Sequence, residues 1–167
     1  PAFNMAGVGK VAFWFGFICY LVLLPIVLYK VLKVGNIPEP ALPTLVIFSA
    51  PASLCLTGYM NAFQEKNMAM VYILLILSQI TYLLVLLTLP KLLKLKFYPS
   101  YSAFTFPLVI SAISLKVTNG FLVNAGNPIA LLKYLAKFEE LFAVIMVIYV
   151  LLRYINFLFN HSETVKG

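Results

Sequence analysis

The stretch SAFTFPLVIS, residues 102–111, lies in a run with no charged side chain between Lys96 and Lys116. An apolar run of about twenty residues is long enough to cross the hydrocarbon core of a membrane as an α-helix. This run also contains Pro107, two phenylalanines and several hydroxyls. Because proline removes a backbone hydrogen-bond donor, the stretch predicts a membrane helix that is interrupted at Pro107.

The composition of the whole chain is that of a membrane protein. Of its 167 residues, 63% are hydrophobic and 10% are charged, and the mean hydropathy is +1.00. A soluble domain has roughly 45–50% apolar residues, and this chain has too few charged residues to cover a core of its size. Long apolar runs without period-2 alternation favour helices over barrel strands. We therefore predict an all-α integral membrane protein.

Five apolar segments follow one another along the chain. They cover residues 11–32, 42–60, 68–89, 101–118 and 128–159. The short connections between them favour antiparallel neighbours, so we predict about five transmembrane helices in hairpins and a single transmembrane domain over residues 1–167. In the last segment, we expect Glu139 and Glu140 to pair with Lys133 or Lys137 at the membrane interface, although a buried glutamate could instead serve a proton relay.

The net charge of +7 does not indicate a nucleic-acid partner, because the lysines lie at the ends of the apolar segments, where topology signals and lipid headgroup contacts place them. Counted on alternating sides of five spans, one side has Lys30, Lys33, Lys91, Lys94, Lys96, Arg153 and Lys166, and the other has Lys10, Lys66, Lys116, Lys133 and Lys137. This modest bias predicts a cytoplasmic C-terminus. We expect a multi-pass protein of the plasma membrane.

The apolar segments contain no arrangement that is typical of an enzyme. They hold no Ser/His/Asp, Cys/His or paired-carboxylate constellation, and His161 stands alone in the C-terminal tail. Cys19 and Cys55 lie inside apolar runs, so they are interpreted as small buried residues. We expect no enzyme activity, no metal site and no cofactor.

Prolines interrupt three of the segments, at Pro25, Pro51 and Pro107, and each should kink its helix. Two of these segments also have hydroxyls at helical spacing: Ser49, Ser53 and Thr57 in one, and Ser111, Ser114 and Thr118 in the other. Such a stripe often serves close helix packing. Two stripes on proline-broken helices favour a polar path for an ion, with Lys116 either at its mouth or extended to the interface.

The motifs IFSAPASLCLTGYM, residues 47–60, and YSAFTFPLVISAIS, residues 101–114, resemble the tellurite-resistance/dicarboxylate transporter family. That family includes bacterial tellurite-resistance proteins, fungal malate permeases and plant guard-cell slow anion channels. The Ala-Pro run followed by Gly-Tyr is similar to its seventh helix, and the aromatic-Thr-Phe-Pro run is similar to its ninth. The five segments here resemble helices six to ten of its ten-helix architecture.

The resemblance implies a function and a site. Family members form trimers, and in each protomer five hairpins surround a central pore lined by the odd-numbered helices. A phenylalanine of the ninth helix occludes the pore, and by motif position that residue is Phe106. Yet Phe106 lies about 140° from Ser111 around an ideal helix, so only a bend at Pro107 could bring both onto one face.

Only two of the five pore-lining helices would be present in this chain. Because residue 1 is Pro1 and not methionine, we expect the C-terminal half of a longer protein, with a half-size subunit as the other possibility. The expected function is transport of small anions, such as malate, tellurite or an inorganic anion. A proton-coupled dicarboxylate carrier and a non-transporting scaffold or accessory subunit remain alternatives.

Overall fold

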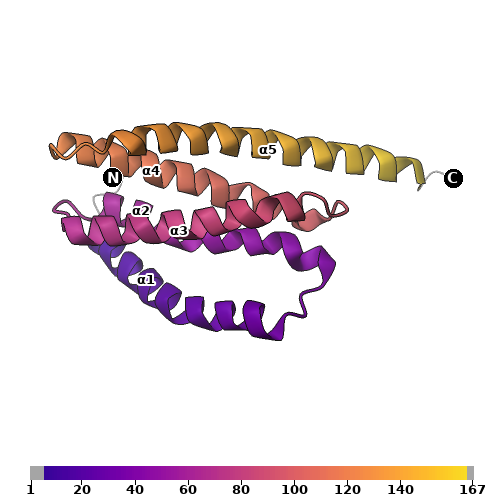
Figure 1. Cartoon of the computed structure of the whole chain (residues 1–167), viewed down its shortest axis with the longest axis horizontal. Coiled ribbons are helices and arrows are strands. Elements are labelled where there is room, and N and C mark those ends of the chain that lie inside the picture. The colour runs from indigo at the N-terminus through magenta and orange to yellow at the C-terminus, as the bar shows by residue number, and fades with distance from the viewer. Residues whose placement is uncertain (1–5, 165–167) are drawn as a thin grey trace.

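The computed structural model describes residues 6–164 (Figure 1). Pro1 and Lys166, and the side chain of His161, lie outside the described residues. Within this part of the chain, five helical segments are long and apolar enough to cross a membrane: Gly7–Tyr29, Glu39–Ala62, Met68–Leu92, Pro99–Asn124 and Ala130–Phe159. The predicted all-α membrane fold is therefore confirmed.

The first span is one continuous helix. Helix α1 (Ala6–Tyr29) passes through Pro25 without ending and continues into a short π-helix, η1 (Lys30–Val34). Gly35 ends this segment with a φ of 62°, a left-handed conformation that glycine adopts at low steric cost.

The second and fourth spans each consist of a 3₁₀ helix followed by an α-helix. The second joins η2 (Glu39–Ser49) to α2 (Ala50–Ala62), and the fourth joins η3 (Pro99–Phe104) to α4 (Phe106–Asn124). Pro51 and Pro107 are each the second residue of the α-helix, a position where the missing N–H removes no intrahelical bond. A change of helix type at each proline thus takes the place of the simple kink that we expected, and the Ile47 carbonyl accepts a hydrogen bond from the Ala50 N–H.

The third and fifth spans are unbroken α-helices, α3 (Met68–Leu92) and α5 (Ala130–Thr164). Asn67 caps the start of α3, because its Oδ1 accepts hydrogen bonds from the backbone N–H groups of Ala69 at 2.9 Å and Met70 at 3.4 Å. Between α4 and α5 the chain turns through Gly126, which has a φ of 74°.

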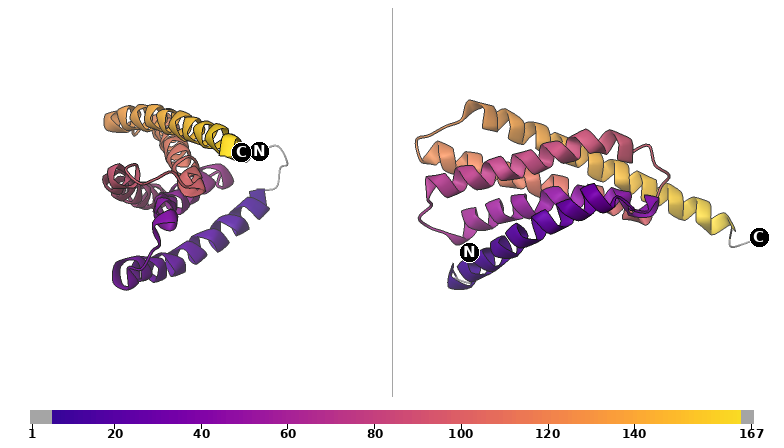
Figure 2. Two further views of the ribbon diagram at one scale, coloured as in Figure 1. Left: turned by 90° about the vertical axis from the view of Figure 1, so that its right-hand side faces the viewer. Right: turned by 60° about the horizontal axis from the view of Figure 1, so that its bottom comes forward.

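The helices are arranged around a central pair formed by α2 and α4. The end-on view in Figure 2 places α3 against one side of this pair, while α1 and α5 diverge as two outer helices on its flanks. Helix α1 packs on α2, and α5 packs on α4. Only 17% of the apolar window of α1, and 17% of that of α5, is buried inside the described structure, so both present long apolar surfaces outward.

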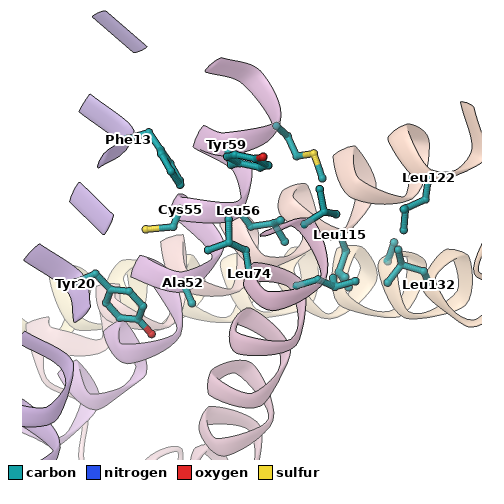
Figure 3. Close-up of a cluster of buried hydrophobic side chains, with 14 residues drawn as sticks. Phe13, Tyr20, Ala52, Cys55, Leu56, Tyr59, Leu74, Leu115, Leu122 and Leu132 are labelled. Carbon is teal, nitrogen blue, oxygen red and sulfur yellow. The ribbon is translucent and has the colours of Figure 1, made fainter. Parts of the chain in front are cut away.

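Two clusters of buried side chains hold the helices together. In the first, Leu56, Leu74 and Leu115 bring α2, α3 and α4 into contact, and Phe13 and Tyr20 add α1 (Figure 3). The second cluster joins α3, α4 and α5 to the 3₁₀ segments, with Tyr101 and Phe104 fully buried. The two broken spans are therefore packed on their inner sides along their whole length.

Candidate functional site

The two helix breaks face a common hollow. It has a volume of about 410 Å³ and is lined by Thr44, Ile47, Ala50, Pro51, Leu54, Ser100, Ser102, Ala103, Phe106 and Pro107. Phe106 begins α4 at the edge of this hollow and is 54% exposed, whereas Phe104 is fully buried. The fold thus brings Phe106, Pro51 and Pro107 together at one hollow, although Pro51 and Pro107 lie in different spans.

Hydrogen bonds between the two 3₁₀ segments fix the rim of the hollow. The Tyr98 hydroxyl donates to Glu39 Oε1 at 3.0 Å, and Ser100 Oγ donates to the Pro40 carbonyl at 2.5 Å. The hydrogen bond to Glu39 also raises the pKa of Tyr98 above its usual range. These contacts join residues about sixty positions apart and hold η2 beside η3.

Helix α4 has two chemically different faces. Phe106, Ile113 and Lys116 are exposed, and their spacing places them on one side of the helix. Ser111 and Ser114 lie on the other side and are fully buried. The change of helix type at Pro107 does not bring Phe106 and Ser111 onto one face.

Most of the predicted hydroxyl stripes lie inside helix contacts. Five of the six hydroxyl residues have no exposed surface: Ser49, Ser53, Ser111, Ser114 and Thr118. Four of these donate to their own helix backbone, at distances of 2.7–3.2 Å. The sixth residue, Thr57, is partly buried. A role in lining a pore stays a prediction for these residues, and their placement favours helix packing.

Other hydroxyls, which the spacing argument missed, face the hollow beside Phe106. Thr44 and Ser102 are exposed, and Ser100 is partly exposed. They lie in the 3₁₀ segments, where the period is three residues per turn and not 3.6. Hydroxyls at this spacing do not match an α-helical stripe, so the sequence pattern did not identify them. The nearby prolines were the available signal for these segments.

An ion pair connects α4 to α5 on the exposed side. Lys116 Nζ lies 2.9 Å from Glu140 Oε1, and the two side chains are 66% and 54% exposed. Our prediction that Glu140 pairs with Lys133 or Lys137 was wrong, because α4 packs against α5 and brings Lys116 within reach. Beside the pair is a second hollow, of about 340 Å³, which Val109, Ile113 and Val144 also line.

Glu139 occupies a different environment from its neighbour. Its side chain is 1% exposed, so the expected position at the membrane interface was also wrong. It interacts with Ser111 of α4 and with Gln79 of α3, and Tyr82 of α3 lies close enough to affect it electrostatically. Each of the four residues has a buried polar side-chain atom that makes no hydrogen bond in the structure. This is a buried polar cluster between three helices.

Among the described residues, no group of three or more His, Cys, Asp and Glu side chains could hold a metal ion. Cys19 is partly buried and Cys55 is buried, and both are free thiols. The chemistry available at the hollow is thus that of an aromatic ring, hydroxyls and apolar side chains.

Comparison with protein families gives one relevant match. A family model described as "SLAC1: Voltage-dependent anion channel" matches residues 1–155, which is most of the chain. Comparison with curated proteins and with solved structures gives no match.

Proposed function

Because the chain belongs to the voltage-dependent anion channel family, we propose that it moves small anions through a central pore that Phe106 occludes. Family membership supports anion transport in general. The observation that carries the finer proposal is the position of Phe106, which is 54% exposed at the junction of the two broken spans. An aromatic side chain at that position can block a narrow path by excluding water.

In this proposal the prolines shape the path. Pro51 and Pro107 set the points where the 3₁₀ segments give way to α-helices, and both line the hollow that Phe106 borders. Thr44 and Ser102 have exposed side chains at this hollow, whereas the hydroxyl stripes are mostly buried. Thr44 donates to the Ala41 carbonyl at 2.6 Å and Ser102 to the Pro99 carbonyl at 3.1 Å, so an anion would compete with these bonds. Few fixed charges at the hollow would allow an anion to enter and also to leave.

We further propose the surroundings that such a pore requires. The hollow is open on the side of Phe106, so further spans must complete the wall, and the N-terminal half of a longer protein is the partner that we favour. The mostly unburied apolar surfaces of α1 and α5 suit lipid, further spans or a homotrimer contact. The chain spans a membrane several times; we propose the plasma membrane, with the C-terminus in the cytoplasm. Malate, tellurite and inorganic anions are the candidate substrates.

The test is Phe106→Ala in the protein with its proposed further spans present, with anion flux measured in liposomes. We expect faster flux, because the smaller side chain no longer fills the path. Phe138→Ala is a matched control, since Phe138 is 53% exposed on α5 and does not line the hollow. Unchanged flux in Phe106→Ala would remove the gate assignment. A wild-type protein that carries no flux even with the further spans present would favour the scaffold alternative, which also agrees with buried hydroxyl stripes.

A second candidate, the proton-coupled carrier, is favoured by one observation. Glu139 is a buried carboxyl among Gln79, Tyr82 and Ser111, and an ionisable side chain inside a membrane protein is often functional. If protons move with the anion, a proton gradient should drive uptake in the wild-type chain, and Glu139→Gln should abolish that dependence. Glu65→Gln, in the exposed loop between α2 and α3, is the control. Uptake that ignores the proton gradient would contradict coupling and support the channel.

A further inference from the structure

The Lys116–Glu140 pair lies deep along its helices. Lys116 is eight residues before the end of α4 at Asn124, which corresponds to about 12 Å at the α-helical rise. Glu140 is ten residues after the start of α5 at Ala130, or about 15 Å. The polar interface on each side of a bilayer is only roughly 5–8 Å thick. We take the ends of α4 and α5, which the turn at residues 125–129 joins, as the membrane surface. Measured from these ends, the pair lies below the polar interface.

The exposure of two charged side chains, Lys116 and Glu140, within the membrane-spanning part of the helices needs an explanation. Both side chains are more than half exposed, and charged groups within a bilayer almost always face the protein interior or a water-filled cavity. Lys116 does not extend towards the end of α4, because its ammonium group is held 2.9 Å from Glu140. We conclude that this side of α4 and α5 does not face lipid.

The same side of α4 carries Phe106. Lys116 follows Phe106 by ten residues, about 15 Å along the helix, and the two positions are within about 80° of each other. Ile113, 42% exposed, lies between them on this face. Two hollows flank the face: one contains Phe106 and the other contains Lys116 and Glu140. A water-filled path to Phe106 would pass the ion pair.

We propose that Lys116 is an anion-binding residue of the vestibule that leads to Phe106, and that Glu140 competes with the passing anion for the Lys116 ammonium group. This inference rests on the proposed function. The ligand is a small anion that one ammonium group can hold, either an inorganic ion or a carboxylate. Because Glu140 neutralises Lys116 when no anion is bound, the net attraction between Lys116 and the anion is weak enough for the anion to leave.

The competition makes opposite predictions for the two partners. Glu140→Gln frees the ammonium group, so the anion concentration for half-maximal flux should fall by up to about fivefold, the upper end of what an exposed pair contributes. Lys116→Gln removes the cation and leaves Glu140 to repel anions, so that concentration should rise by a similar factor. Glu65→Gln, which removes a carboxylate from an exposed loop, should leave it unchanged.

A purely structural pair predicts a different pattern. If the pair only joined α4 to α5, both single variants would change flux in the same direction, and the exchange Lys116→Glu with Glu140→Lys would restore it. That result would overturn the proposal. The flux assay uses chloride, nitrate and malate separately, so that the preferred class of anion emerges from the size of the Glu140→Gln effect.

A second measurement does not depend on transport. Lys116→Cys should react with a water-soluble thiol reagent in the intact membrane, because the vestibule is filled with water. Leu87→Cys, at a position on α3 that is 67% exposed and apolar, should not react. If Lys116→Cys is as unreactive as Leu87→Cys, the proposal is wrong. If it reacts while the wild-type protein, with its further spans present, shows no flux, the proposed function fails and the water-exposed vestibule stands.

Discussion

Phe104 and Phe106 give a sharp test of the fold at the helix break. They are two residues apart, yet Phe104 is fully buried and Phe106 is 54% exposed. Phe104 packs against Tyr101 with ring centroids 4.8 Å apart and belongs to the cluster that joins η3 to α3 and α5. We predict that Phe104→Ala destabilises the protein strongly, whereas Phe106→Ala affects flux and has little effect on stability.

The expected loss in unfolding free energy depends on which of the lost interactions lipid or detergent can replace. In soluble proteins a buried Phe→Ala change costs about 3–5 kcal/mol, which combines a transfer term and a cavity term. Lipid and detergent are as apolar as the core, so a membrane protein loses mainly dispersion contacts and packing. We therefore expect about 2–4 kcal/mol for Phe104→Ala. For Phe106→Ala we expect less than about 1 kcal/mol, since half of its side chain has no protein contact to lose.

The assay is thermal or chemical unfolding in detergent, followed by the fluorescence of the single tryptophan, Trp14. Phe104→Leu is a useful companion, because it keeps most of the volume and should recover more than half of the loss. Equal destabilisation by Phe104→Ala and Phe106→Ala would refute the reasoning. It would mean that Phe106 is packed in the protein and does not border an open path.

Three further predictions concern other positions. Asn67→Ala should lower the free energy of unfolding by about 1 kcal/mol, because α3 loses its N-cap, and Asn67→Ser should recover most of it in the same unfolding assay. Arg153→Gln should lower the free energy of unfolding by about 1–2 kcal/mol. The guanidinium lies 5.7–5.9 Å from the ring centroids of Phe97, Tyr101 and Tyr149. Equal melting temperatures of the variant and the wild type would show that these contacts are weak. Ser53→Ala should leave anion selectivity unchanged, because its hydroxyl is buried and bonded to the Ser49 carbonyl; a shifted reversal potential would place Ser53 in the path.

The five spans could be predicted from the sequence because the bilayer imposes a length and a composition on each of them. The segment 68–89 is a clear example: it lies within α3, which continues to Leu92. The 3₁₀ segments could not be predicted in the same way. Pro51 and Pro107 mark where an α-helix can begin, but they do not say which type of helix precedes them. That depends on packing between η2 and η3.

The partners of charged side chains depended even more on the tertiary structure. Glu140 has Lys137 three residues before it, which made a pairing on one helix reasonable. The structure pairs it with Lys116, twenty-four residues away, because α4 and α5 pack closely. Glu139, the adjacent residue, points to Ser111 and Gln79. On a helix, adjacent side chains diverge by about 100°, so two neighbouring glutamates can have opposite environments.

The two faces of α4 explain how one helix can serve both packing and transport. Ser114 and Thr118 satisfy their hydroxyls on their own backbone, so these two side chains can lie against neighbouring helices without unpaired donors. Hydroxyls that are already bonded and buried are poor ligands for a passing ion, because their donors would first have to leave the helix. The opposite face carries Phe106 and Lys116, which have exposed side chains and could act on an anion without any change in packing. Pro107 therefore matters less as a bend that turns the helix than as the start of an α-helix that presents Phe106 at its first position.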